Sequence, residues 1–131
     1  MTMATPPELT EPEARVMRVL WDAGSKSAKR VVEALGDLYG YSPSTTYTLI
    51  YRCIKKNAIR RVDPGFILEP QISREEVQDY ETRQLVDKLF DGSVDGLFTA
   101  LVDRKKVSLE AISRMKLLVD RYEQRGDEEG E

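Results

Sequence analysis

Apolar positions recur every three or four residues in the first third of the chain, which is the spacing of helices with one buried face. Thr10 can cap a first helix with Glu13 at the capping-box position, and Gly24 ends it. Ser27 can cap a second helix, which ends near Gly40. The apolar stripes of these two helices are Val16, Met17, Leu20 and Trp21, then Val31, Val32, Leu35 and Leu38.

A third helix and a hairpin are expected next. Ser42-Pro43 pairs an N-cap residue with proline at the first helical position, so the third helix follows the second almost at once. Two short apolar runs, 58–62 and 66–70, then flank Asp63-Pro64-Gly65, a tripeptide typical of turns. Three helices followed by a hairpin predict a mainly α fold, an α+β winged helix-turn-helix.

Helical patterning resumes after Pro70. Ser73 and Glu76 form another capping box, Ser93 starts a short helix, and Ser108 caps a last one. In about sixty residues these helices cannot bury their own apolar faces, so we predict a two-fold dimer; the alternative is that they pack back on the N-terminal half as one domain. The residues expected in the dimer interface are Tyr80, Leu89, Phe90, Leu97, Phe98, Leu101, Ile112, Met115, Leu118 and Val119.

Charge divides the chain at the same place. The formal net charge is -3, but residues 1–70 carry about +2 and the remainder about -5. The N-terminus at 1–8 and the acidic tail at 124–131 are expected to be disordered. The expected domains are therefore a winged-helix DNA-binding domain at 9–71 and a helical dimerisation domain at 72–123.

Composition excludes several classes of function. The chain has one cysteine and no histidine, which excludes disulfide frameworks, Cys/His zinc sites and histidine-based catalytic triads. No Gly-rich phosphate loop appears, and paired carboxylates lie at a helix start or in the tail. We expect no enzyme activity, cofactor or metal. No apolar run approaches the ~20 residues of a membrane span, so a cytoplasmic protein without a membrane partner is expected.

The strongest functional signal lies between Tyr41 and Val62, which hold five cations and no acid. At about 100° per residue, Thr46, Leu49, Ile50, Cys53 and Ile54 share one face of the third helix and leave hydroxyl and basic residues opposite. Hydroxyls can contact base edges, and Arg can bind guanine bidentately. The alternative is an ordinary solvated face. The residues expected to bind DNA are Ser44, Thr45, Tyr47, Thr48, Tyr51, Arg52, Lys55, Lys56, Arg60 and Arg61.

Two segments resemble motifs of the BlaI/MecI family of bacterial penicillinase repressors. LTEPEARVMRVLW at 9–21 is similar to the family's L-T-x-x-E-x-x-V-M-x-x-L-W, and YSPSTTYTLIYR at 41–52, followed by Lys55-Lys56, is similar to W-S-P-x-T-x-x-T-L-I-x-R and K-K. The resemblance implies a homodimer that binds palindromic double-stranded operator DNA and represses transcription. The positions that match the family's DNA contacts are Ser44, Thr45, Tyr47, Thr48 and Arg52.

The sequence departs from the family in places that concern induction. The resistance members respond to a membrane sensor through cleavage at an Asn-Phe bond, which makes a protease or membrane sensor a candidate partner. The matching positions here are Ala100-Leu101, and Cys53 alone cannot supply the cysteine motif of copper-responsive relatives. The rival function is a winged-helix module that binds protein and not DNA; a steep loss of DNA affinity with salt would separate the two.

Overall fold

The computed structural model describes residues 5–129, without the side chains of residues 118, 119 and 122–129. The chain divides into two compact units, the first ending at Thr82 and the second beginning at Arg83. The division falls inside a helix, whereas the expected domain boundary lies before residue 72. Each unit is described by itself.

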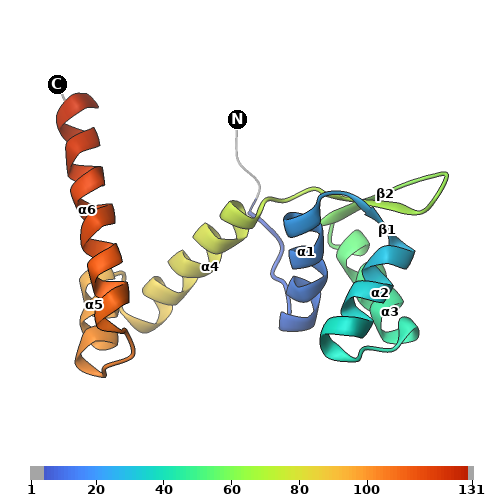
Figure 1. The fold of residues 1–131 in the computed structure, drawn as a ribbon, viewed down its shortest axis with the longest axis horizontal. Coiled ribbons are helices and arrows are strands. Elements are labelled where there is room, and N and C mark those ends of the chain that lie inside the picture. Colours follow the sequence, from blue (N-terminus) through green and yellow to red (C-terminus); the bar gives the residue numbers. More distant parts are fainter. Residues whose placement is uncertain (1–4, 130–131) are drawn as a thin grey trace. The chain divides into compact units, whose positions relative to one another are not determined.

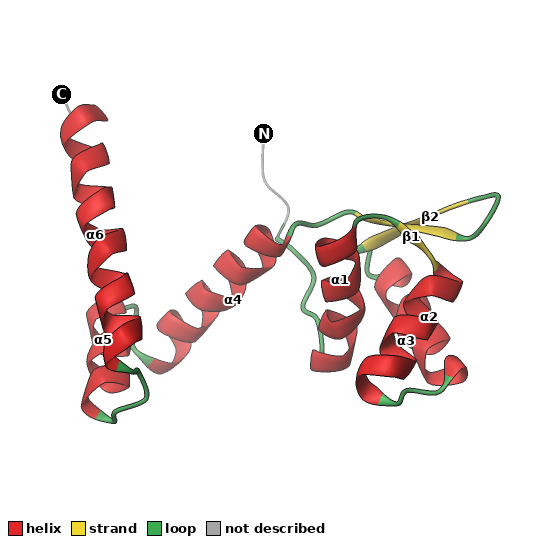
Figure 2. Ribbon diagram, in the orientation of Figure 1, coloured by secondary structure: helices red, strands yellow, loops and turns green. Residues whose placement is uncertain are grey.

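The first unit is built from helices and a small sheet in the order helix, strand, two helices, two strands. Its helices lie around one core, and the strands form a ribbon along its edge (Figures 1 and 2). The elements are α1 (Glu11–Ala23), β1 (Lys26–Ser27), α2 (Ala28–Tyr39), α3 (Pro43–Lys55), β2 (Ile59–Val62) and β3 (Ile67–Pro70). The order agrees with the expected winged helix.

The cap residues explain where the helices begin. The Thr10 hydroxyl accepts from the Glu13 amide, and the Glu13 carboxylate accepts from the Thr10 amide at 2.9 Å, which confirms the capping box of α1. Ser27 caps α2 and Ser42 caps α3 through their hydroxyls. At the end of α2, Gly40 has a left-handed backbone (φ 70°) that a residue with a Cβ adopts only with strain.

The sheet contains one strand more than expected. Its order is β1-β3-β2 with antiparallel pairs, so β3 is central, Lys26 lies opposite Leu68, and Arg61 lies opposite Leu68 on the other side. The hairpin is as predicted, although Phe66 belongs to the turn, with a positive φ of 50°. Strand β1 could not be predicted from the sequence, because two residues are too few to show the alternation of apolar and polar side chains that marks a strand.

The core of the first unit joins α1, α2, α3 and the sheet. The buried apolar side chains are Val16, Met17, Leu20, Ala28, Val31, Leu35, Leu49, Ile50, Cys53, Ala58, Ile59 and Leu68. Trp21 packs against this core, and its Nε1 donates to the Ile72 carbonyl at 2.9 Å. Leu38 was expected in the stripe of α2 but is 65% exposed, because it lies in the last turn, beyond the core.

Three helices follow: α4 (Arg74–Leu89), which begins in the first unit, α5 (Val94–Asp103) and α6 (Leu109–Glu129). Ser73 and Glu76 make the expected capping box, and Ser93 and Ser108 bond to the first turns of α5 and α6. In the second unit Val86 is the one buried side chain among those the structure describes. The apolar faces of α5 and α6 are therefore largely unburied within the single chain.

Helix α6 continues into the acidic C-terminal segment. The acidic segment from residue 124 was expected to be disordered, but the backbone of α6 is helical to Glu129. Glu123, Gln124 and Arg125 favour the extension, which continues through Gly126 and Asp127. Leu118 and Val119 lie on α6, and their side chains are outside the described set. Within residues 5–129, none of the helices has the length and apolar character needed to cross a membrane.

Candidate nucleic-acid interface

Helix α3 has one buried face and one exposed face. Thr46, Leu49, Ile50 and Cys53 are buried, which confirms the inward face predicted from the helical period. The exposed residues are Ser44, Thr45, Thr48, Tyr51, Arg52 and Lys55, while Tyr47 is half-buried. Neither Arg52 nor Lys55 makes an ion pair with a described residue. Both charges are therefore available to an external anion.

The hydroxyls at the start of α3 have local partners but keep bonding capacity. Ser42 Oγ donates to Thr45 Oγ1 at 3.0 Å, and Thr48 Oγ1 donates to the Ser44 carbonyl at 3.1 Å. A hydroxyl carries one donor and two acceptor positions. Thr48 can therefore still accept a hydrogen bond, and the Thr45 hydroxyl can still donate one.

An aromatic cluster joins α3 to the hairpin. The Phe66 ring lies 6.0 Å from that of Tyr47 and 5.9 Å from that of Tyr51. The Arg61 guanidinium stacks 3.6 Å above the Phe66 ring and pairs with Asp63 at 3.1 Å. These contacts hold the tip of the hairpin beside the middle of α3, and they keep the Arg61 charge at that position.

Arg60 and Arg61 lie on opposite faces of β2, as neighbours on a strand do. Arg60 is in register with Glu69 on β3, and their side chains pair at 2.6 Å. Arg61 lies on the face that carries Leu68 and the aromatic cluster. The two arginines were expected to have the same role, but only Arg61 is placed beside α3.

Lys56 differs from the other cations of the set. Its ammonium lies 2.6 Å from Glu13 Oε1 and 2.8 Å from the Glu8 carbonyl oxygen. The Glu13 side chain is 2% exposed. Burial acts to raise the pKa of Glu13, but hydrogen bonds from Lys56 and Thr10 and the Lys56 charge outweigh it and hold the pKa below its usual value. Lys56 is thus bound to α1 and the segment before it.

The single cysteine is part of the core. Cys53 is fully buried, and burial, followed by the nearby charge of Glu13, raises the pKa of its thiol to about 12. The thiolate is the reactive form of cysteine. This confirms the interpretation of Cys53 as a core residue.

A second group of cations was missed from the sequence. Lys26, Lys29 and Arg30 are exposed, and none of them pairs with an acid in the described part of the chain. They lie on β1 and the first turn of α2, and β1 pairs with the hairpin strand β3. The segment 24–32 contains no acid. That signal was available, but only the order of elements places it next to the hairpin.

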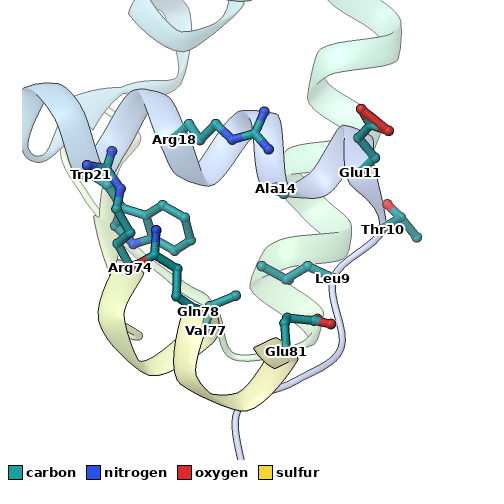
Figure 3. Close-up of a pocket in the computed structure, with 10 residues that line it drawn as sticks. All are labelled: Leu9, Thr10, Glu11, Ala14, Arg18, Trp21, Arg74, Val77, Gln78 and Glu81. Carbon is teal, nitrogen blue, oxygen red and sulfur yellow. The ribbon is translucent and has the colours of Figure 1, made fainter. Parts of the chain in front are cut away.

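A hollow of about 620 Å³ lies elsewhere on the first unit, between α1 and the first turns of α4 (Figure 3). Apolar residues from both elements and the Trp21 ring line it, with Arg18 and Arg74 on one side and Glu11 and Glu81 on the other. Arg74 pairs with Asp22, and Glu11 pairs with Arg15. No residue of α3 lines this hollow, so it is separate from the exposed face of α3.

The helices, the three-stranded sheet and the exposed face of α3 define a winged-helix protein. The chain belongs to the penicillinase repressor family, a family of transcriptional repressors, because the model of that family matches residues 9–121. It is 23% identical over 124 residues to the penicillinase repressor of Bacillus licheniformis, covering 93% of this chain and 97% of that protein. It is 22% identical over 116 residues to the methicillin resistance regulatory protein MecI of Staphylococcus aureus, covering 87% and 94%.

Solved structures agree with this assignment. The solution structure of the DNA-binding domain of the repressor BlaI matches with a TM-score of 0.51 and 30% identity, over 56% of this chain and 93% of that one. A structure of monomeric Bacillus licheniformis BlaI in complex with the blaP half-operator matches with the same values. The chain is thus a DNA-binding repressor of the winged-helix class.

Proposed function

We propose that this protein binds a palindromic operator as a homodimer in the bacterial cytoplasm and represses transcription by occupying the promoter. Each protomer places α3 in the major groove, with Ser44, Thr45 and Thr48 at base edges and Arg52 bidentate to a guanine. Lys55 and Arg61 contact flanking phosphates. Tyr47 and Tyr51 pack against Phe66 and so hold the β2–β3 hairpin beside α3.

The observation that carries the proposal is the exposed, unpaired Arg52 on α3, one turn beyond Thr48. An exposed guanidinium with no acid partner among the described residues can bind DNA without first breaking an internal ion pair. The half-operator complex of BlaI supports the same use of the domain. Lys26, Lys29 and Arg30 extend the cationic surface along β1 and α2.

The dimer is proposed from the second unit. Its helices expose Leu89, Val94, Phe98, Val102, Leu109 and Leu117. Large apolar side chains exposed in this number indicate an interaction site. A second copy bound there gives a dimer whose two α3 helices are related by a two-fold axis. Half-sites one DNA turn apart, about 34 Å, suit such a dimer.

The test is operator binding by an Arg52→Ala variant. A duplex is first selected from randomised 30-base-pair DNA by the wild-type protein, and Kd is then measured at several salt concentrations. Loss of a bidentate base contact should cost about 1–3 kcal/mol and relax preference at one base pair. Arg18→Ala, which removes an exposed cation beside the separate hollow, should leave Kd unchanged. Equal Kd values for wild type and Arg52→Ala would refute the assignment.

The salt dependence tests the rival of a protein-binding module. A protein that neutralises several phosphates loses affinity linearly in log Kd against log salt, with a slope of about 0.9 per contact. We expect a steep slope for the wild-type protein. A flat dependence, or no duplex retained at low salt, would favour the module that binds protein.

A further inference from the structure

We propose that the Glu13–Lys56 ion pair positions the recognition helix, and that Lys56 affects DNA binding through Glu13 and not by touching a phosphate. The inference rests on the proposed DNA binding. It assigns a role to Glu13, a buried carboxylate that makes none of the proposed DNA contacts.

The pair joins the start of α1 to the end of α3. Lys56 is the C-cap of α3, and its amide donates to the Arg52 carbonyl at 3.0 Å. Its ammonium lies 2.6 Å from Glu13 Oε1, which also accepts from the Thr10 amide at 2.9 Å. One carboxylate oxygen therefore links the cap of the first helix to the cap of the recognition helix.

A second bond tightens this link. The Lys56 ammonium also donates to the Glu8 carbonyl oxygen at 2.8 Å. An ammonium has three donors, so two of the three are used inside the protein. The Lys56 side chain is 35% exposed. A phosphate contact would have to compete with two short internal bonds, one of them charge-assisted.

Burial explains why the pair holds its geometry. An ionised carboxylate in the protein interior is tolerated only when it is paired and hydrogen-bonded. Glu13 lies beneath the surface, so Lys56 is kept over it. Because Lys56 ends α3, the pair limits rotation and sliding of the helix that carries Arg52 and Lys55.

The sign of one substitution separates positioning from contact. Glu13→Gln removes a negative charge, and if Lys56 touches phosphate it releases that lysine, so DNA affinity should then stay the same or rise. If the pair positions α3, Glu13→Gln should weaken binding instead. We expect Kd for the selected 30-base-pair duplex to rise about tenfold, a coupling typical of residues in direct contact.

Salt slopes give an independent readout with a neighbouring control. Lys55→Met should lower the slope by about 0.9, the value of one phosphate contact. Lys56→Met should raise Kd about tenfold with the slope unchanged, and the double variant Glu13→Gln/Lys56→Met should be no weaker than either single variant. Lys56→Arg, which keeps a cation over Glu13, should restore most of the affinity.

Folding is checked in the same samples. Trp21, the single tryptophan, reports by its fluorescence whether the first unit is folded, and all Kd values are measured below the unfolding midpoint of the weakest variant. If Lys56→Met does not fold, Glu13→Gln and Lys56→Arg carry the test, because both keep the side-chain volume.

The outcomes are distinct from those that test the proposed function. Weaker binding by Glu13→Gln, an unchanged slope for Lys56→Met and rescue by Lys56→Arg support the positioning role. A slope lowered by about 0.9 in Lys56→Met, or equal or tighter binding by Glu13→Gln, overturns it while leaving DNA binding intact. Failure of the wild-type protein to retain any duplex overturns the proposed function itself.

Discussion

The two units of this protein treat their apolar side chains in opposite ways. The first unit closes α1, α2, α3 and the sheet around a core of buried aliphatic side chains. The second unit leaves large side chains outside, with Phe98 at 47% and Leu109 at 82% exposure. Composition does not explain this difference in burial, because the sequence of α5 is more apolar than that of α1, α2 or α3.

The difference follows from how the elements contact one another. In the first unit a three-stranded sheet and three helices enclose a volume, so each element covers another. The described part of the second unit holds helices alone, with one buried side chain, Val86. The first unit is thus stabilised from within, whereas the second leaves its large apolar side chains for the partner surface that we propose.

The largest expected effect lies in the core of the first unit. Leu35→Ala deletes a fully buried side chain and should lower the free energy of unfolding by about 2–5 kcal/mol. Leu38→Ala, one turn further along α2 and exposed, is the matched control and should change it by less than about 0.5 kcal/mol. Urea unfolding followed by Trp21 fluorescence measures both. Equal losses would mean that α2 is not packed as described.

The second prediction concerns the apolar face of α5. Phe98→Glu places a charge in the proposed dimer interface, so the protein should become monomeric at concentrations where the wild type is a dimer. Binding to a two-half-site duplex should weaken about a hundredfold, because linked sites gain affinity by about that factor or more.

Sedimentation at matched concentrations and a titration of the selected duplex check this result. Thr99→Glu adds the same charge at the next, polar position of α5 and should leave the dimer intact. A wild-type protein that sediments as a monomer, or a Phe98→Glu variant that remains dimeric, would contradict the proposed interface.

Much of the first unit was predictable because local rules act there. The caps at Thr10, Ser27 and Ser42 use residue types that are strongly preferred at helix N-termini. The helical period correctly separated Thr46 and Leu49 from the exposed face. Tertiary packing agrees with these local preferences. The sequence therefore predicted the helices, the hairpin and the inner face of α3, but not strand β1.

The remainder depends on contacts between distant segments. Strand β1 exists because Lys26 and Ser27 meet β3, more than thirty positions along the chain. The pairing of Lys56 with Glu13 likewise crosses from one helix to another, so a lysine in a basic run could not be distinguished from its neighbours. Residue type sets the charge, and tertiary contacts decide where that charge is used.

The third prediction tests the internal pairing of the first unit by pH. Glu13→Gln should lower the free energy of unfolding by about 1.5–3 kcal/mol at neutral pH, the range for a hydrogen bond to a charged group. The folded pKa of Glu13 is held below its usual value, so this stabilisation is present above the unfolded pKa and is lost as pH falls through the folded pKa.

The difference between wild type and Glu13→Gln should therefore shrink as pH falls below the usual range of a glutamate. Urea midpoints at a series of pH values measure it. Glu33→Gln, at an exposed position of α2, is the control and should show no such convergence. A difference that persists unchanged in acid would show that the carboxylate charge is not what stabilises the pair.

The smallest expected effect concerns an exception within the well-packed unit. Thr46 is fully buried on the inner face of α3, and its Oγ1 has no hydrogen-bond partner among the described atoms. Thr46→Val keeps the shape and removes that hydroxyl, so it should raise the free energy of unfolding by about 1 kcal/mol or less.

Thr48→Val is the control on the outer face of α3. It removes a hydroxyl that is already solvated, so it should not stabilise the fold. Thr48→Val should weaken duplex binding, whereas Thr46→Val should leave duplex binding unchanged. Urea unfolding and one duplex titration for each variant measure both effects. If Thr46→Val destabilised the first unit, the hydroxyl would have to be bonded in solution, and the inner face of α3 would be more polar than its packing indicates.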